Sequence, residues 1–325
     1  MCTTQKALTD YGAACVESES FDRKASTAAG IIDILTTVVP VCVPNFILPS
    51  VVARSIGNGR GNGFNQFRGP WGIAVHPSGV IIVADVVCHR LQLVKQDGTF
   101  LRSIGNGKGK GVNQFSLPAS VAILHSGNFV VSDYGNHRLQ IVREDGTFVR
   151  SIGKRKGNGP DQFDQPQGVA ILPSGTIVVC DAGNNRLVLV KENGSFMGTI
   201  DNGKGSGRDQ FNDPCGVTIL PSGTIVVCDF LNHRLQFVKE DGTFLKSIGN
   251  GRGSGPNRYD KFNSIARLPS GVLVVSDSKI KRLQFLQEDG TFLGSLKGGW
   301  EGIAVLPDGS LVAGSYKKDR LDFLI

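Results

Sequence analysis

The stretch Asp133–Gly153, DYGNHRLQIVREDGTFVRSIG, decides the fold of this chain. Its centre, Arg-Leu followed seven residues later by Asp-Gly or Asn-Gly, returns along the sequence. Five Arg-Leu pairs stand 48 residues apart and a sixth follows 38 residues later: Arg90-Leu91, Arg138-Leu139, Arg186-Leu187, Arg234-Leu235, Arg282-Leu283 and Arg320-Leu321. A fixed period of this length is typical of solenoids, propellers and other repeat arrays.

One repeat contains four short strands and no helical period. In the third repeat the strands are predicted at Gln167–Leu172, Thr176–Asp181, Asn185–Lys191 and Ser195–Ile200. The Asn-Gly at residues 193–194 is a strong signal for a two-residue hairpin turn between the last two. Four strands joined by tight turns form one antiparallel sheet.

Such a sheet cannot bury both of its faces alone, so the repeats must stack. Radial stacking closes the array, and six Arg-Leu copies predict six blades. The last repeat stops at Ile325 after its third strand, whereas Val51–Ile56 precedes the first repeat without a partner. We therefore predict an all-β, six-bladed β-propeller of four-stranded antiparallel blades, in which this N-terminal strand pairs with Arg320–Ile325 and completes the last blade.

The repeats resemble NHL repeats, which have the form Pro-x-Gly-Val-Ala, then Val-Val-x-Asp-x-x-Asn-His-Arg-Leu-Gln-x-Val, then Asp-Gly-Thr-Phe. The best matches are Asp133–Gln140 and Asp229–Gln236. The resemblance covers about five-sixths of the chain and implies a six-bladed propeller. It implies no single function, because the family includes RNA-binding propellers, substrate-recruiting modules of ubiquitin ligases, bacterial extracellular sensors and an amidating lyase.

The chain of 325 residues divides into an extension, residues 1–50, and the propeller, residues 51–325. Within the apolar part of the extension, Asp33, Pro40, Pro44 and Pro49 argue against a membrane-spanning helix, which needs about 20 uninterrupted apolar residues. We expect a partly disordered or packed arm and no membrane contact. The seven cysteines form no Cys-x-x-Cys pair, which favours a reducing, cytoplasmic compartment.

An Asp stands five residues before the Arg in each of the first five repeats. A carboxylate and a guanidinium at the two ends of a tight corner can pair while the carboxylate also accepts turn amides. Because a group needed once per blade is structural, we interpret these residues as corner pairs: Asp85 with Arg90, Asp133 with Arg138, Asp181 with Arg186, Asp229 with Arg234 and Asp277 with Arg282.

Neither a metal nor a cofactor is expected. Three histidines, His89, His137 and His233, share one repeat position, but equivalent positions diverge from blade to blade and cannot meet at a Zn–N distance of about 2 Å. The glycine-rich segments between repeats lead into strands, whereas a phosphate-binding loop leads into a helix.

The blade-linking loops carry thirteen basic and seven acidic residues, an excess of six, in a chain of net charge +7. A basic, glycine-rich face suits an acidic peptide or a phosphate backbone, with aromatic residues available for stacking. The predicted binding residues are Arg60, Lys108, Lys110, Lys154, Arg155, Lys156, Lys204, Arg208, Arg252, Tyr134 and Phe230.

Three functions follow from these features. The first is a non-catalytic scaffold that recruits a protein or peptide partner, as substrate-recognition NHL modules of ubiquitin ligases do. The second is single-stranded RNA binding on the basic face. The third is a propeller enzyme of the lyase or esterase type, which needs unique metal or acid–base groups around the central channel. The inner strands, such as Gly168–Ile171, offer small or apolar residues there, so we predict a monomeric binding propeller that is not an enzyme.

Overall fold

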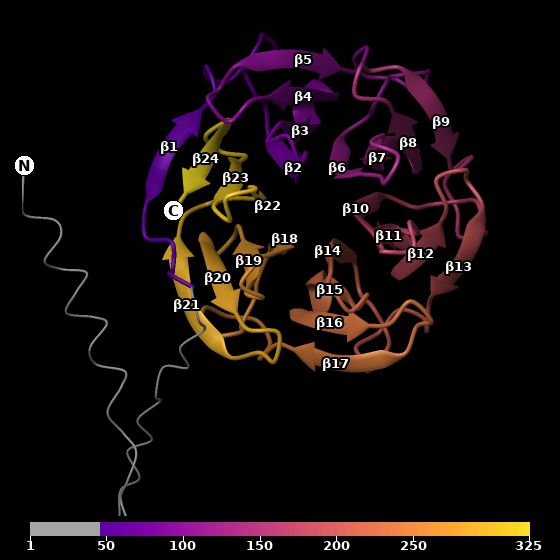
Figure 1. Cartoon of the computed structure of the whole chain (residues 1–325). Coiled ribbons are helices and arrows are strands. Elements are labelled where there is room, and N and C mark those ends of the chain that lie inside the picture. Colours follow the sequence, from indigo (N-terminus) through magenta and orange to yellow (C-terminus); the bar gives the residue numbers. More distant parts are fainter. Residues whose placement is uncertain (1–45) are drawn as a thin grey trace, which may run out of the picture. The chain divides into compact units, whose positions relative to one another are not determined.

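The computed structural model describes residues 46–325, so the prediction for the first 45 residues of the extension lies outside the described part. Six four-stranded antiparallel sheets surround a central axis (Figure 1). This confirms the predicted six-bladed propeller. The outermost strand of each blade lies along the circumference and the innermost strand borders the axis (Figure 1).

Each blade consists of four strands in sequence order, except the last. Blades 1 to 3 contain β2 (Pro70–Val75), β3 (Ile81–Asp85), β4 (Arg90–Val94) and β5 (Phe100–Ile104); β6 (Pro118–Ile123), β7 (Phe129–Asp133), β8 (Arg138–Val142) and β9 (Phe148–Ile152); and β10 (Pro166–Ile171), β11 (Ile177–Asp181), β12 (Arg186–Val190) and β13 (Phe196–Ile200). Blades 4 and 5 contain β14 (Pro214–Ile219), β15 (Ile225–Asp229), β16 (Arg234–Val238) and β17 (Phe244–Ile248); and β18 (Phe262–Arg267), β19 (Leu273–Asp277), β20 (Arg282–Leu286) and β21 (Phe292–Lys297).

Blade 6 joins the two ends of the propeller. Its inner strands are β22 (Gly302–Val305), β23 (Leu311–Ser315) and β24 (Arg320–Leu324), and its outer strand is β1 (Val52–Ile56). In the β1–β24 ladder Ile56 lies opposite Leu321, and the Ser55 hydroxyl donates to Asp322 Oδ1 at 2.6 Å. The predicted closure of the ring by the N-terminal strand is therefore confirmed.

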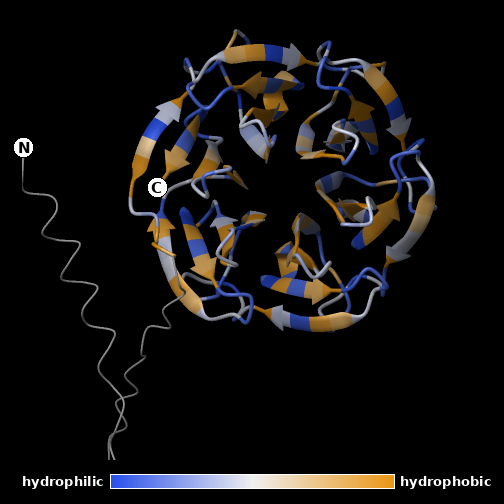
Figure 2. Cartoon of the chain, viewed as in Figure 1, coloured by the Kyte–Doolittle hydropathy of each residue, from blue (hydrophilic) through white to orange (hydrophobic). Residues whose placement is uncertain are grey.

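The core consists of layers between neighbouring blades. Leu91 of blade 1, for example, belongs to the same buried cluster as Val131 of blade 2. Phe67, Phe115, Phe163 and Phe211 are fully buried plugs ahead of the inner strands, and Tyr259 takes that place in blade 5. Hydrophobic residues follow the strands, while the loops are mostly hydrophilic (Figure 2). Burying apolar area between sheets stabilises the ring by roughly 25 cal/mol per Å².

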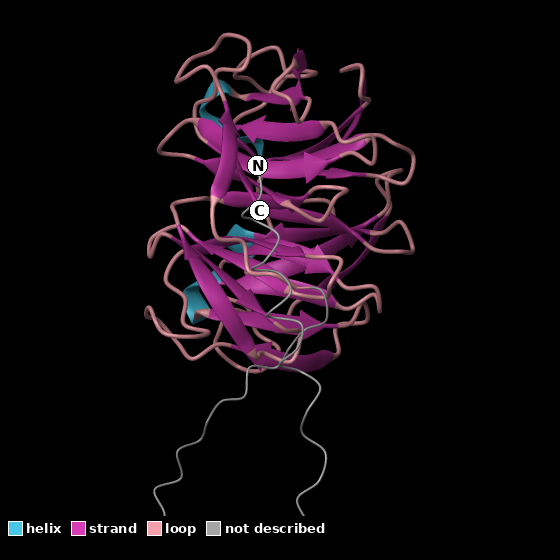
Figure 3. Cartoon of the chain, turned by 60° about the vertical axis from the view of Figure 1, so that its left-hand side comes forward, coloured by secondary structure: helices cyan, strands magenta, loops and turns pink. Residues whose placement is uncertain are grey.

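One face of the ring carries the corners between the second and third strands. In blades 1 to 4 each corner contains a short 3-10 helix: η1 (Val86–Cys88), η2 (Tyr134–Asn136), η3 (Ala182–Asn184) and η4 (Phe230–Asn232). These helices gather toward one side of the ring (Figure 3). We call this side, together with the blade-linking loops bonded to it, the corner face.

Candidate functional site at the mouth of the channel

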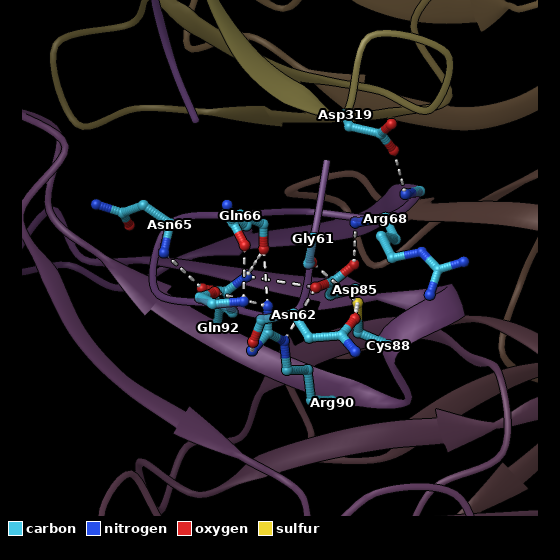
Figure 4. Close-up of polar contacts among 12 residues, drawn as sticks. Gly61, Asn62, Asn65, Gln66, Arg68, Asp85, Cys88, Arg90, Gln92 and Asp319 are labelled. Carbon is cyan, nitrogen blue, oxygen red and sulfur yellow. Dashed lines mark hydrogen bonds and ion pairs between the residues drawn. The ribbon is translucent and has the colours of Figure 1, made fainter. Parts of the chain in front are cut away.

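The corner pairs attach each blade-linking loop to its blade. In blade 1, Arg90 Nε lies 3.0 Å from Asp85 Oδ2, and the other guanidinium nitrogens donate to the carbonyl oxygens of Asn62, Gly63 and Gln66 (Figure 4). The second Asp85 oxygen accepts the Arg68 N–H at 2.7 Å. Blades 2 to 4 repeat this pairing, with Nε–Oδ2 distances of 2.8 Å. These groups hold the loops, so they are structural here.

The fifth and sixth corners differ from this pattern. The predicted Asp277–Arg282 pair does not form: the Asp277 carboxylate accepts backbone N–H groups of Asp260, Lys261 and Ile280, and Arg282 Nε has no hydrogen-bond partner within residues 46–325. That prediction is wrong because the carboxylate is already occupied by backbone donors. In blade 6, where Ser315 stands in place of the corner Asp, Asp322 Oδ1 lies 2.7 Å from Arg320 Nε.

The repeated histidines link successive blades. Nδ1 of His89 accepts the N–H of Leu117 at 3.0 Å, and Nδ1 of His137 accepts that of Gln165 at the same distance. In the next blade, Oδ1 of Asn185 accepts the backbone N–H of Asp213 in the same way. Burial, together with the nearby Lys108 ammonium, lowers the pKa of His89, which favours the neutral ring that can accept this bond. Within residues 46–325, no three His, Cys, Asp or Glu side chains are grouped so that they could hold a metal ion.

The predicted basic residues are exposed and spread around the whole corner face. Five of them occupy one repeat position, one in each linking loop except the short loop into blade 6: Arg60, Lys108, Lys156, Lys204 and Arg252. Several have carboxylate partners, with Lys156 Nζ 3.3 Å from Asp164 and Arg252 Nε 3.1 Å from Asp260. Acidic side chains within the same loops therefore partly neutralise this ring of charge.

The two predicted aromatic residues do not share a site with those bases. Tyr134 lines a pocket at the end of the central channel. Phe230, at the same corner position two blades further on, packs against the core between blades 4 and 5, with its ring 6.4 Å from that of Phe262. Of the other aromatic candidates, Tyr259 and Trp300 are buried, and Trp71 is half-buried at the channel.

The channel is narrow where the six inner strands meet. Its central cavity measures about 90 Å³, well below the roughly 300–1,000 Å³ of usual small-molecule pockets. The inner strands approach so closely here that a Cβ added at Gly72 would lie 2.5 Å from the Cα of Ser120 in the next blade. Only glycine or serine occupies this position around the ring: Gly72, Ser120, Gly168, Gly216, Ser264 and Gly302. A ligand that binds at the axis must therefore do so at a mouth of the channel.

The mouth on the corner face is surrounded by two repeat positions that differ from blade to blade. The first position directly precedes the glycine or serine of each inner strand and contains Trp71, Ala119, Gln167, Cys215, Asn263 and Glu301. The second opens each corner and contains Val86, Tyr134, Ala182, Phe230, Ser278 and Tyr316. Neither position has a consensus residue. This contrasts with the corner pairs and with the glycines, and it marks the mouth as the place where blades have distinct roles.

A pocket of about 290 Å³ opens at this mouth, lined by residues of blades 1, 2, 3 and 6. We call it the aromatic pocket; the residues that matter most to it are Trp71, Val86, Leu117, Tyr134, Gln167 and Tyr316. The rings of Trp71 and Tyr316 meet edge to face, with centroids 6.1 Å apart. Its wall is mainly apolar, and Gln167 supplies an amide.

Glu301 is the one acid at the inner-strand position of the mouth. It is 9% exposed, and its Oε2 accepts the backbone N–H of Tyr316 at 2.8 Å. Burial raises the pKa of Glu301, while the ammonium groups of Lys261 and Lys317 act in the opposite direction. Lys261 Nζ also lies 5.9 Å from the ring centroid of Trp71. A buried carboxylate with a raised pKa next to a pocket is typical of an acid–base group.

A second acid lies across the mouth. Asp213 is half-buried, accepts a weak bond from Gln167 Nε2 at 3.4 Å, and has a pKa that burial raises. Sequence reasoning missed both acids as site residues because it counted them only as charges of the linking loops. The sequence did contain a signal for Glu301, which is the single acid at its repeat position.

Comparison with known proteins agrees with this architecture. The NHL repeat family matches residues 67–94, 115–142, 163–188 and 211–236. No curated protein matches the chain in sequence. None of the helices within residues 46–325 is long and apolar enough to cross a membrane.

Several solved structures share the fold. Virginiamycin B lyase from Staphylococcus aureus is 15% identical with a TM-score of 0.58, over 79% of this chain and 81% of that one. A gluconolactonase from Xanthomonas campestris is 15% identical with a TM-score of 0.64, over 80% and 87%. Hydrazine synthase from Kuenenia stuttgartiensis is 13% identical with a TM-score of 0.58, over 79% and 95%.

The prediction that the chain is not an enzyme is contradicted by these similarities, because the lyase and the gluconolactonase are enzymes built on the same kind of propeller. That prediction considered only the inner-strand residues inside the channel and left out the residues at its mouth. At this level of identity the likeness shows the fold alone.

Proposed function

Since this chain is an NHL-repeat β-propeller, we propose that it is an enzyme of the propeller lyase or esterase type with its active site at the mouth of the channel. The observation that carries the proposal is Glu301, a buried acid beside the aromatic pocket. The residues at the same repeat position in the other five blades are not acidic. The enzymes among the similar structures support the reaction type.

Glu301 would act as the general base. A carboxylate whose pKa is raised is a stronger proton acceptor than an ordinary glutamate, and acid–base catalysis typically contributes about 10²–10⁴-fold to a rate. In a lyase reaction it would take a proton from a carbon next to a carbonyl group, and the leaving group would depart from the neighbouring carbon. In an esterase reaction it would take a proton from water as the water attacks the ester carbonyl carbon; the acyl C–O bond then breaks, and the alcohol leaves with the proton returned by Glu301.

Lys261 would assist either reaction. Both reactions place negative charge on a carbonyl oxygen in the transition state, and a nearby ammonium stabilises such charge. Lys261 is close enough to Trp71 and Glu301 to act on both the ring and the carboxylate. The backbone N–H of Tyr316, bonded to Oε2, would hold the Glu301 carboxylate in place.

Glu301→Gln tests the proposal, because the amide keeps the shape but cannot accept the proton. The full chain is assayed by pH-stat and chromatography against a panel of lactones, linear esters and β-substituted carbonyl compounds. We expect turnover by the wild type and a loss of at least 100-fold in kcat/KM for the variant. The wild-type rate should rise with pH through the raised pKa of Glu301, because the base must be ionised.

Asp209→Asn is the matched control, since Asp209 is an exposed acid in a linking loop. It should leave the rate unchanged. The proposal fails if the wild type turns over no compound of these classes, or if Glu301→Gln keeps the wild-type rate.

Polyanion binding, with single-stranded RNA as the ligand, is a second candidate function. It is favoured by the five bases at one repeat position, and disfavoured by the aspartates paired with several of them. Retention on RNA that falls steeply with salt, and that is lost when Lys154, Arg155 and Lys156 are changed to Ala, would support it. Absence of retention at low salt would remove it. Recruitment of a protein or peptide by the same loops stays a prediction.

A further inference from the structure

We infer that the aromatic pocket binds a flat, uncharged ring carried by the substrate and thereby selects which compounds reach Glu301. This inference rests on the proposed function, since it names the substrate class of the same site. Three aromatic residues from three blades, Trp71, Tyr134 and Tyr316, contribute to the wall of the pocket. Aromatic walls favour partners that can stack or meet them edge to face.

The charges around the pocket favour a neutral ligand. No charged side chain lines it, and charged groups of both signs lie near its aromatic residues. Lys261 lies near Trp71, so a cation on that side would meet a like charge. On the opposite side the carboxylates of Asp213 and Asp164 are close enough to Tyr134 to add to the effect of burial in raising its pKa, so an anion would be repelled there. An uncharged ring avoids both repulsions.

Size limits the ligand further. Pockets for small molecules usually measure about 300–1,000 Å³, so a volume of about 290 Å³ lies at the small end. One ring with a few substituents fits, whereas a peptide or an oligonucleotide does not. Gln167 is the polar residue in the wall that can orient such a ring by hydrogen bonding.

Leu117 gives an independent sign that the pocket is a binding site. Its backbone is left-handed, with φ of 54°, as it is at the equivalent Gly69, Gln165 and Asp213, so the conformation belongs to the repeat and only the leucine side chain is particular to this blade. Left-handed backbone suits leucine less well than glycine, and the equivalent residues of the other blades are all glycine, polar or charged. The leucine side chain stays 37% exposed at the pocket, and His89 Nδ1 holds its N–H. An apolar side chain that stays exposed at the pocket, at a position that is glycine, polar or charged in every other blade, indicates contact with an apolar ligand.

The test uses three probes with the same ring and different charge: benzyl alcohol, benzoate and benzyltrimethylammonium. Binding to the full chain is measured by isothermal titration calorimetry and by tryptophan fluorescence. Trp71 is one of two tryptophans, and the other, Trp300, is buried and bonded to Asp322 at 2.9 Å. A probe in the pocket should therefore change the emission of Trp71.

We expect benzyl alcohol to bind saturably at one site per chain, at least tenfold more tightly than either charged probe. Tyr134→Ala and Tyr316→Ala should each weaken this binding at least tenfold. Leu231→Ala, which removes an exposed apolar side chain from the corner of blade 4, should leave it unchanged. Equal or tighter binding of a charged probe, or no effect of the tyrosine variants, would overturn the inference.

The same titration on Glu301→Gln separates this inference from the proposed function. Ring binding should persist in that variant, because Glu301 does not line the pocket. If the ring binds but Glu301→Gln retains full turnover, the catalytic proposal fails and the pocket stands. If turnover depends on Glu301 but no probe binds, the pocket assignment fails alone.

Discussion

Asp133 and Tyr134 are neighbours in the sequence but belong to two differently organised regions of the corner face. Asp133 is part of a corner network that returns in four blades with nearly the same distances. Tyr134 belongs to the mouth of the channel, where the equivalent residues of the other blades are valine, alanine, phenylalanine, serine and tyrosine. Two adjacent residues therefore have different roles: Asp133 makes a structural contact that recurs in four blades, whereas Tyr134 contributes a side chain to the mouth that few blades share.

This difference shows how a repeat protein can contain a single ligand-binding site. A contact that every blade needs is fixed by the geometry of the blade, and the same residue serves it each time. A ligand at the axis touches all blades at once but needs each chemical group only once. Conformity to the repeat therefore indicates structure, and departure from it at the mouth indicates function.

Replacing Asp133 gives the largest expected effect. Asp133 is fully buried and accepts bonds from the Ser116 N–H, Asn136 and Arg138. In Asp133→Ala the guanidinium keeps its place without its counter-ion, which costs about 3–5 kcal/mol of unfolding free energy. Urea denaturation followed by circular dichroism measures this loss.

Tyr134→Ala is the matched change at the next residue. Tyr134 is half-buried, so its loss should lower the unfolding free energy by about 1 kcal/mol. If the two variants were equally destabilised, the corner and the mouth could not be distinguished as structural and functional regions.

Removing the histidine that links blades 1 and 2 should have an intermediate effect. His89→Ala leaves the Leu117 N–H without its acceptor, which costs about 1 kcal/mol at neutral pH. His233→Ala is the control for the left-handed backbone at this position, since φ is 56° and 53° at the two residues. Nδ1 of His233 has no hydrogen-bond partner within residues 46–325, so this variant should lose less.

The same link predicts a pH dependence. The pKa of His89 is lowered in the folded chain, so its contribution is complete above the usual value of about 6.5 and is lost as the pH falls through the lowered value. His89→Asn should keep the link without this dependence, because Asn185 already serves that role in blade 3. Thermal unfolding between pH 5 and 8 measures it. An unchanged acid dependence in His89→Asn would show that His89 is not responsible.

The smallest stability change is expected at the mouth itself. Glu301→Gln removes a carboxylate whose raised pKa reflects the cost of burying its charge at neutral pH. The variant should unfold within about 0.5 kcal/mol of the wild type, or be more stable, at pH 7. Urea denaturation at pH 7 checks this. A strong destabilisation would mean that Glu301 is structural like Asp133.

Most of the fold could be predicted from the sequence, and little of the site could. The period of Arg-Leu, the Asn-Gly turn at residues 193–194 and the unmatched strand Val51–Ile56 follow from local patterns and from counting. The exception in the corners, Asp277, depended on which backbone N–H groups reach its carboxylate, and that follows from the packed structure of blade 5.

Local sequence patterns are enough to predict a closed ring of six blades, because a twisted sheet with two apolar faces requires a neighbour on each side. Which side chains meet at the axis depends instead on how the blades pack against one another. Trp71, Tyr134 and Tyr316 lie on blades 1, 2 and 6, and closure of the ring through β1 and β24 brings the last of them beside the first. That contact has no local signal in the sequence, since it depends on the ends of the ring coming together.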